Sequence, residues 1–335
     1  MQKKTESKPA PLSVGRQILR SAANVTEGFA MLAGIGTLLA FGARESVWLD
    51  NLCHFRAQYA LALAAGCLIW LSRQKRIHLF LGAAILLWNL ILLFPYLWPS
   101  GRTAHPGQPT LTVLLFNVRT ENPAPEKVVA FLRETPSDVV VLEEINEEWV
   151  KILDPWAKQM AGRMEYPQDD NFGMGLYSRQ RFAATKWEVA SDPKTTPSLS
   201  ACILFDGKPV NLLAIHPLPP GRDETWNLRN HQLGLAARWC AKQEDNAIVM
   251  GDLNLTPWSP FFRDFCRQAR LDDPRRGRGI FPTWPSLTPL LLIPLDMILV
   301  QHKLQVTGIR RGPSLHSDHY PLIVQIQWND CSSQK

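Results

Sequence analysis

A carboxylate and an amide follow one short apolar run in this chain of 335 residues, and their spacing suits chemistry on a ligand. Residues 247–250 read Ala-Ile-Val-Met, a run typical of a buried strand, and Gly251 permits a turn. Asp252 and Asn254 come next, and in an extended segment their side chains point the same way. Polar groups at the end of a buried strand are how α/β enzymes meet their ligands. Taken alone, the pattern fits an Asx-type turn equally well.

Other polar side chains stand where further apolar runs end. The resulting cluster consists of Asn117, Glu144, His216, Asp252, Asn254, Asp296, Asp318 and His319. Strand ends at one edge of a sheet can converge although they lie far apart in the sequence. Carboxylate and amide oxygens suit a hard divalent cation, and neutral or cationic donors suit a phosphate. The residue types therefore predict a site for metal-assisted chemistry on phosphate.

The elements that must position this cluster are short β runs that alternate with helices. Strands are expected at residues 111–118, 138–142, 172–177, 199–205, 209–216, 247–250, 295–300, 304–309 and 320–326, and helices at 126–134 and 224–242. Another helix is expected to start near Pro257. Asp206-Gly207 between two of the strands is a strong hairpin signal. Hairpins mixed with helices favour an α/β sandwich of two sheets over a single parallel sheet.

Six short motifs add a family resemblance. FNVR, VVVLEE, IH, GDLN, PLD and HSDHYP follow one another between residues 111 and 327. In this order they resemble the endonuclease/exonuclease/phosphatase superfamily, whose members include deoxyribonucleases, sphingomyelinases and inositol-polyphosphate phosphatases. The resemblance implies a deoxyribonuclease-like four-layer α/β sandwich over residues 111–328. It also implies a hydrolase of phosphate esters that uses Mg²⁺ or Mn²⁺.

The resemblance implies that Glu144, Asn117 and Asp318 bind this metal ion. Family members often carry Gln-Glu where this chain has Glu143 and Glu144. Because side chains alternate along a strand, only one of the two glutamates points into the site. We expect Glu144 to be that residue.

The remaining members of the cluster are implied to act on the phosphate. Asp252 would orient or deprotonate the attacking water, and Asn254 would hold a phosphate oxygen. His319 would stabilise charge on the phosphoryl oxygens, with Asp296 fixing its tautomer. His216 would contact the phosphate or the leaving group. The other interpretation of His216 is a strand-end histidine whose hydrogen bonds are satisfied within the protein.

Three apolar segments precede this region. They cover residues 28–43, 57–72 and 77–98, and the third is long enough to span ~30 Å of hydrocarbon. The first two are short, so flanking residues must extend them or the bilayer must thin. A signal peptide and a soluble helical hairpin are the alternative interpretations. We expect a membrane region over residues 1–98 with three transmembrane helices, and a linker over 99–110.

Basic residues set the expected orientation. Residues 1–105 contain 11 Lys and Arg against 4 Asp and Glu, whereas the rest of the chain contains 25 against 26. The basic tail (Lys3, Lys4, Lys8) and the loop at residues 73–76 belong in the cytoplasm by the positive-inside rule. Three crossings then place the catalytic region outside the cytoplasm. Its near-neutral charge does not favour binding of long duplex nucleic acid.

Other features leave the substrate open. The six cysteines contain no CxxC pair, which disfavours zinc, and Cys331 is among those that could form a disulfide. Arg229 either orients the site or is a solvated helix charge. The arginines of residues 263–278 either receive phosphates or form a solvated surface offset by aspartates. The apolar loop at 287–295 either packs on the domain or touches lipid.

The expected function is a membrane-anchored, divalent-metal-dependent hydrolase of phosphate esters, of phosphodiesterase or nuclease type. Phospholipid and sugar phosphate are the alternative substrates to nucleic acid. A non-catalytic phosphate-binding membrane module of the same fold is the contrasting hypothesis. The complete cluster argues against it, because a module without catalysis has no physical need of these residues.

Overall fold

The structure is a computed structural model that describes residues 14–99, 103–188 and 195–329. The tail residues Lys3, Lys4 and Lys8, part of the expected linker (100–102) and Cys331 lie outside this range. The chain divides into two compact units. The first comprises Met1–Leu39 and Arg56–Leu92, and the second comprises Ala40–Phe55 and Leu93–Lys335.

The first unit is helical. Its helices are α1 (Val14–Leu39), α3 (Arg56–Ser72) and most of α4 (Arg76–Leu97). Three stretches are long and apolar enough to cross a membrane: Val14–Gly42, Val47–Ser72 and Arg76–Leu97. The Asn89 side chain of α4 donates a hydrogen bond to Thr37 of α1 at 2.9 Å, which satisfies a polar group in an apolar helix.

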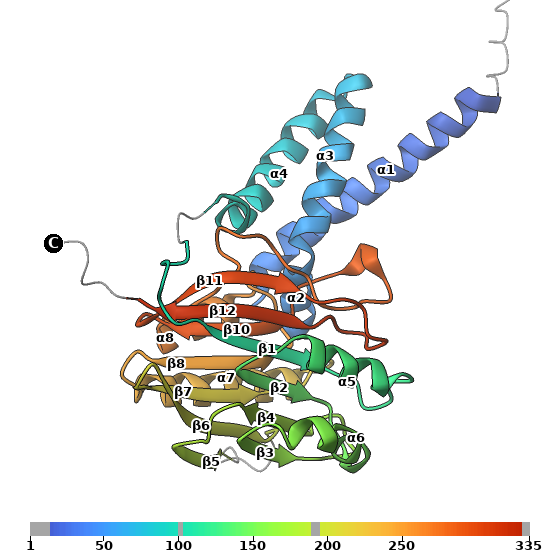
Figure 1. Cartoon of the computed structure of the whole chain (residues 1–335). Helices are drawn as coiled ribbons and strands as arrows, with labels where there is room; N and C mark the ends of the chain where they lie inside the picture. The colour runs from blue at the N-terminus through green and yellow to red at the C-terminus, as the bar shows by residue number, and fades with distance from the viewer. Residues whose placement is uncertain (1–13, 100–102, 189–194, 330–335) are drawn as a thin grey trace, which may run out of the picture. The chain divides into compact units, whose positions relative to one another are not determined.

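Two six-stranded sheets form the centre of the second unit (Figure 1). The first has the order β11-β12-β1-β2-β4-β3, and the second has the order β5-β6-β7-β8-β10-β9. The strands are β1 (Leu111–Asn117), β2 (Val139–Glu143), β3 (Gly162–Tyr166), β4 (Met174–Ser178), β5 (Ala184–Glu188), β6 (Ser198–Phe205), β7 (Lys208–Ile215), β8 (Ala247–Asp252), β9 (Leu271–Asp272), β10 (Asp296–Gln301), β11 (Leu304–Arg311) and β12 (Leu322–Trp328). Among the strands of the described ranges, β1–β2 and β7–β8 pair in parallel and the other pairs are antiparallel.

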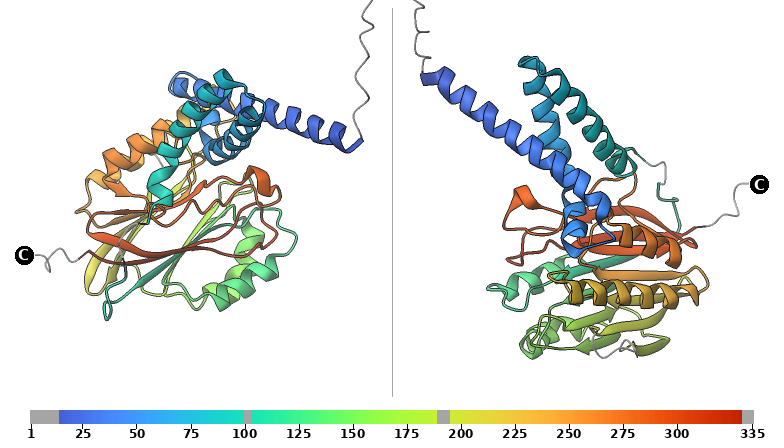
Figure 2. Two further views of the ribbon diagram at one scale, coloured as in Figure 1. Left: turned by 90° about the horizontal axis from the view of Figure 1, so that it is seen from above. Right: turned by 180° about the vertical axis from the view of Figure 1, so that it is seen from behind.

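Helices cover the outer faces of both sheets. On the first sheet, α5 (Pro125–Glu134) and α6 (Glu147–Ala157) bury Phe131 and Trp149 against strands β1 and β2. On the second, α7 (Asp223–Ala241) and α8 (Pro260–Ala269), gold and orange in Figure 2, bury Leu233 and Phe262. Apolar side chains from both sheets form the core between them. The expected four-layer α/β sandwich is confirmed.

The hairpin between β6 and β7 illustrates why local sequence signals succeed. Its strands pair antiparallel, with Phe205 opposite Lys208, and the two turn residues Asp206 and Gly207 have φ angles of 52° and 73°. Asp and Gly tolerate these positive values, which the tight turn requires. The sequence-based prediction of this hairpin is confirmed. The prediction omits the helices α2 (Val47–Asn51) and α6 and the strands β3, β5 and β9.

A short segment between α1 and α3 belongs to the second unit. This segment, Ala40–Phe55, contains the turns η1 (Ala40–Gly42) and η2 (Leu52–Phe55) and the helix α2 (Val47–Asn51). The Ser46 hydroxyl accepts a hydrogen bond from the Trp48 backbone amide and so caps α2. The segment therefore packs as part of the sandwich unit, although α1 and α3 on either side of it belong to the first unit.

Candidate active site

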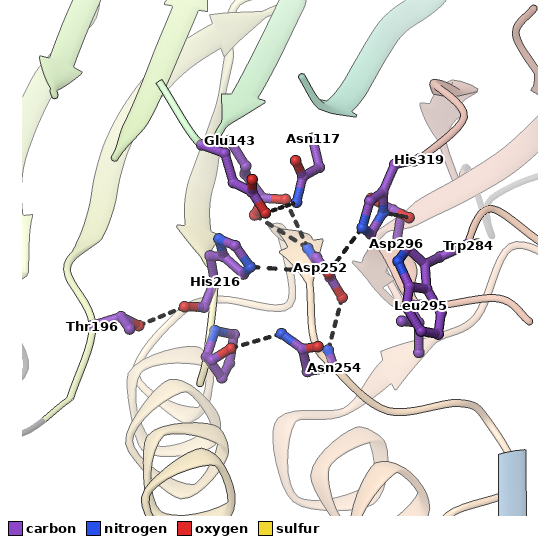
Figure 3. A network of polar contacts seen from close by, with 12 residues as sticks. Asn117, Glu143, Thr196, His216, Asp252, Asn254, Trp284, Leu295, Asp296 and His319 are labelled. Carbon is purple, nitrogen blue, oxygen red and sulfur yellow. Dashed lines mark hydrogen bonds and ion pairs between the residues drawn. The ribbon is translucent and has the colours of Figure 1, made fainter. Parts of the chain in front are cut away.

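The polar residues predicted from the sequence meet at one pocket of the second unit (Figure 3). The pocket has a volume of about 610 Å³. The predicted residues that line it are Glu144, His216, Asp252, Asn254, Asp318 and His319. Asn117 and Asp296 stand directly behind it, hydrogen-bonded to Glu144 and His319 respectively.

Asp252, His319 and Asp296 form a buried row. Strand pairing brings the two aspartates together, because Asp252 at the end of β8 lies opposite Asp296 at the start of β10. The Nδ1 atom of His319 donates to Asp296 Oδ2 at 2.9 Å, and its Nε2 atom lies 3.6 Å from Asp252 Oδ2. All three residues are at most 4% exposed. One imidazole ring thus bridges two carboxylates.

The protonation states of this row follow from burial and charge. Burial opposes the charged form of His319, but the charge of Asp296, its hydrogen bond and Asp252 raise the pKa of His319 to about 10. Burial raises the pKa of Asp252 to about 7, with His319 opposing the rise and Asp296 adding to it. The row therefore holds a cationic histidine beside a carboxyl group that can gain or lose a proton near neutral pH.

The buried Glu143 side chain contacts the backbone of Asp252. Both of its carboxyl oxygens accept from the Asp252 backbone amide, at 3.1 and 3.0 Å. Burial, followed by the charges of Asp252 and Asp296, raises the pKa of Glu143 well above its usual range, which favours the neutral acid. A neutral acceptor is also what glutamine provides, and this accounts for Glu143 where family members often carry Gln.

Gly251 makes the close approach between β7 and β8 possible. Its φ angle is +152°, and a Cβ atom there would lie 1.7 Å from the Ile215 carbonyl oxygen and 2.8 Å from Glu143 Oε1. No side chain fits such a space. The glycine that the sequence suggests as a turn residue is thus required by packing beneath Asp252.

Glu144 lies in the pocket with a positive φ angle of 60°. Its Oε1 accepts from the Asn117 side-chain amide at 2.8 Å, and burial raises its pKa while this hydrogen bond opposes the rise. Asp318, whose Oδ2 accepts from the Trp284 indole at 3.1 Å, is close enough to raise the pKa of Glu144 further. Two carboxyl groups of like charge thus face the same end of the pocket.

This end of the pocket suits a hard divalent cation. Within the described ranges there is no group of three or more His, Cys, Asp or Glu side chains arranged around a point that could hold a metal. Mg²⁺, however, is usually held by one or two carboxylates together with water and substrate phosphate. Glu144 and Asp318, with the Asn117 amide beside Glu144, match that sparse oxygen donor set, which also suits Mn²⁺.

His216 and Asn254 complete the pocket floor. Burial, followed by the charge of His319, lowers the pKa of His216 to about 3, so its ring is neutral. Its Nε2 lies 3.9 Å from Asp252 Oδ2, and its buried Nδ1 has no hydrogen-bond partner among the residues that the structure describes. Asn254, in the left-handed conformation with φ 51°, donates from its backbone to Asp252 Oδ1 at 2.9 Å and from its amide to the Pro217 carbonyl at 2.9 Å.

Several residues that contact the site were not predicted. The Ser317 hydroxyl donates to the Asn117 carbonyl at 2.7 Å and accepts from the His319 amide at 3.0 Å. It ties the end of β1 to the histidine, and its place in the HSDHYP motif was the available signal. From the connecting segment, Asn51, His54 and Phe55 also line the pocket. The unusually polar and aromatic composition of that connection was the only hint.

The arginines fall into two groups. Arg229 is fully buried and donates to Asp50 at 2.6 Å and to the Asn254 carbonyl at 3.0 Å, so it orients the site and is not a solvated charge. Of the 263–278 group, none lines the pocket; Arg267 pairs with Asp264, and Arg275 is buried against Asp273.

The apolar loop at residues 287–295 contributes to the pocket at one end, where Ile293 and Leu295 line it. Its Leu287 is 69% exposed.

Solved structures share this fold. A humanized D. rerio TDP2 is 18% identical, with a TM-score of 0.54 over 65% of this chain and 99% of that one. An endonuclease/exonuclease/phosphatase from Bacteroides vulgatus is 16% identical, with a TM-score of 0.56 over 66% of this chain and all of that one. A third structure, from Beutenbergia cavernae, is 17% identical, with a TM-score of 0.50 over 65% of this chain and 72% of that one. At such identities the likeness concerns the fold alone.

None of the curated proteins matches the sequence. The sequence profile of the Endonuclease/Exonuclease/phosphatase family does match, over residues 114–319. That range runs from β1 to His319 and includes every residue of the predicted cluster. The chain therefore belongs to the Endonuclease/Exonuclease/phosphatase family.

Proposed function

We propose that this protein is a membrane-anchored, divalent-metal-dependent hydrolase of phosphate esters. One observation carries the proposal: the buried row of Asp252, His319 and Asp296 shares a pocket with Glu144. Family membership supports hydrolysis of the phosphodiesterase or nuclease type. A neighbour of the same fold, D. rerio TDP2, has been solved with a single-strand DNA product, which supports a nucleic acid as one substrate class.

In this proposal the row performs the proton transfer. Asp252 accepts a proton from the attacking water, because a carboxyl group with a pKa of about 7 can do so near neutral pH. His319 stays cationic and stabilises the negative charge that grows on the phosphoryl oxygens. Asp296 holds the ring in place, and the neutral His216 contacts the phosphate or the leaving group. Asn254 binds a phosphate oxygen.

Glu144 and Asp318, with Asn117 hydrogen-bonded to Glu144, would hold Mg²⁺ or Mn²⁺ in the same pocket. When bound, the ion offsets the negative charge of the phosphate. Members of the family are generally dependent on a divalent metal, and this supports the assignment. Asn254 and His319 would orient the ester over the Asp252 carboxylate.

Hydrolysis that depends on a metal is the direct test. The full-length protein in detergent micelles is expected to hydrolyse bis-p-nitrophenyl phosphate with Mg²⁺ or Mn²⁺, and EDTA is expected to stop the release of p-nitrophenol. Adding the metal back should restore it. Glu144→Gln should need a higher metal concentration for half-maximal activity, because an amide is a weaker ligand than a carboxylate.

The matched control is Glu143→Gln, which alters the neighbouring residue. Because Glu143 favours the neutral acid and only accepts from a backbone amide, this variant should keep the metal requirement of the wild type. Activity that is unaffected by EDTA would remove the metal assignment. An absence of hydrolysis with either metal would favour the non-catalytic phosphate-binding module.

Phospholipid and sugar phosphate are the second candidate substrates. The apolar part of the pocket lining, which includes Phe172, Trp284, Ile293 and Leu295, would accommodate the apolar part of a phospholipid ester. The three apolar helices favour a substrate at or near the membrane. Both features are compatible with the same hydrolytic chemistry.

We further propose that the catalytic unit lies outside the cytoplasm. The support is the distribution of Lys and Arg around three helices that are long enough to span a bilayer. Alkaline phosphatase fused after Lys335 in a bacterial host is expected to be active, because that reporter folds only where disulfides form. Green fluorescence from a cytoplasmic reporter at the same position would contradict the orientation.

A further inference from the structure

The segment Ala40–Phe55 contributes directly to the pocket, although in the sequence it only connects two apolar helices. Asn51, His54 and Phe55 line the same pocket as Asp252 and His319. Nothing in the family match accounts for them, since the match begins at residue 114. The catalytic unit therefore has one wall that is not part of the family domain.

A buried charge pair anchors this wall. Asp50 is fully buried, and its Oδ2 accepts from Arg229 Nη2 at 2.6 Å and from the Trp226 indole at 3.0 Å. Its Oδ1 accepts from the Ser259 hydroxyl at 2.7 Å. Three donors from α7 and the start of α8 thus satisfy one carboxylate. A buried ion pair with this many hydrogen bonds fixes the position of the segment.

The Arg229 guanidinium also links the wall to the loop that follows β8. Arg229 Nη1 donates to the Asn254 backbone carbonyl at 3.0 Å, and the Asn254 backbone N–H donates to Asp252 Oδ1 at 2.9 Å. Asp50 and Asp252 are therefore joined through two residues. These hydrogen bonds fix the position of the wall relative to the Asp252 carboxylate. The side chains of the wall therefore keep a constant distance from the proposed base.

Two further contacts shape the wall itself. The Asn51 side chain donates to the Pro220 carbonyl at 3.3 Å, and a hydrogen bond of 3.0 Å joins His54 Nδ1 and Thr256 Oγ1. Phe55 follows at the pocket edge. The wall thus presents an imidazole and a phenyl ring, both on a backbone that is tied to the sandwich.

The volume and lining of the pocket limit what it can take. About 610 Å³ lies within the range of about 300–1,000 Å³ that is typical of sites for a single small ligand. Phe172 and Trp284 also line it. Aromatic rings of this kind offer stacking surfaces to a planar group. One nucleoside fits within this volume.

We propose that Asn51, His54 and Phe55 are specificity-determining residues that contact the organic group of the ester, and that they select a planar group about the size of one nucleoside. The expected changes in KM and kcat rest on the proposed hydrolase function, whereas the expected binding does not. The substrate is then a nucleotide ester, either free or at a single-stranded end. The group esterified to the phosphate packs on the wall while the phosphate lies over Asp252.

The test compares two p-nitrophenyl esters on the full-length protein in detergent micelles. One is the ester of thymidine monophosphate and the other is methyl p-nitrophenyl phosphate, in which a methyl group replaces the nucleoside. Phe55→Ala and His54→Ala should each raise KM for the thymidine ester about 10-fold with little change in kcat. The methyl ester should change by less than about 2-fold.

A binding measurement separates this inference from the hydrolase proposal. Thymidine monophosphate, titrated with Mg²⁺ and followed by tryptophan fluorescence, should bind the wild type and bind both variants about 10-fold more weakly. Trp48→Ala is the control, because Trp48 lies on the same segment, is 70% exposed and does not line the pocket. It should behave like the wild type. Phe55→Leu serves as a second variant that keeps an apolar side chain.

Three outcomes would overturn the inference: no binding of thymidine monophosphate by the wild type, equal binding by the wall variants, or equal losses for both esters. A clear preference for p-nitrophenyl phosphorylcholine over the thymidine ester would also overturn it in favour of a lipid headgroup. If the wild type binds as expected but hydrolyses neither ester with Mg²⁺ or Mn²⁺, the hydrolase proposal is wrong. The proposal that the wall residues contact the nucleoside is then still supported by the binding result.

Discussion

Replacement of Asp252 by asparagine is expected to lower kcat for bis-p-nitrophenyl phosphate by about 10³-fold or more. The variant removes the group that takes the proton from water and also a charge that holds His319 cationic. Asparagine retains an oxygen that can accept from the Asn254 backbone N–H, as Asp252 Oδ1 does at 2.9 Å. The loop that follows β8 should therefore keep its conformation. Initial rates at saturating substrate and metal measure the effect.

The matched control is Asp264→Asn, which removes an aspartate from the surface of α8. Asp264 pairs with Arg44 and Arg267 and does not line the pocket. Its kcat should equal that of the wild type. Equal kcat for Asp252→Asn and wild type would show that the attacking water is activated elsewhere, and the assigned base would be wrong.

Replacement of Asp50 by alanine is expected to have the largest effect on stability. It leaves the guanidinium of Arg229 in a fully buried position without its carboxylate, and it also leaves Trp226 and Ser259 without their acceptor. Breaking a buried ion pair by removing one partner costs about 3–5 kcal/mol. The unfolding midpoint in detergent should therefore fall markedly, as followed by tryptophan fluorescence during denaturant titration.

Two comparisons test the physical reason. Asp264→Ala removes the surface partner of Arg44, whose side chain is 54% exposed, and such a pair contributes less than about 1 kcal/mol. The double variant Asp50→Leu with Arg229→Met removes both charges and should be more stable than Asp50→Ala alone. If Asp50→Ala unfolds at the same denaturant concentration as Asp264→Ala, the ion pair does not anchor the segment.

The two-sheet sandwich and the candidate members of the site cluster could both be predicted from the sequence. This succeeded where the signal is local: the Asp206-Gly207 turn needs two positive φ angles, and Gly251 precedes Asp252 at the end of an apolar strand. Strands that end in polar residues must present them at a sheet edge. The predicted cluster is therefore found at one pocket in the structure.

The surroundings of that cluster depend on contacts between segments that lie far apart in the sequence. Glu143 and Glu144 are adjacent in the sequence, yet one is buried beneath Asp252 and the other lies in the pocket, a difference set by pairing with β8 and by the positive φ angle of Glu144. Arg229 could be interpreted as a solvated helix charge because its counterion, Asp50, lies 179 residues away. Residues 40–55 have the sequence position of a mere connection between helices. Local patterns report local geometry, whereas a charge pair or a pocket wall depends on contacts between segments that only the folded chain brings together.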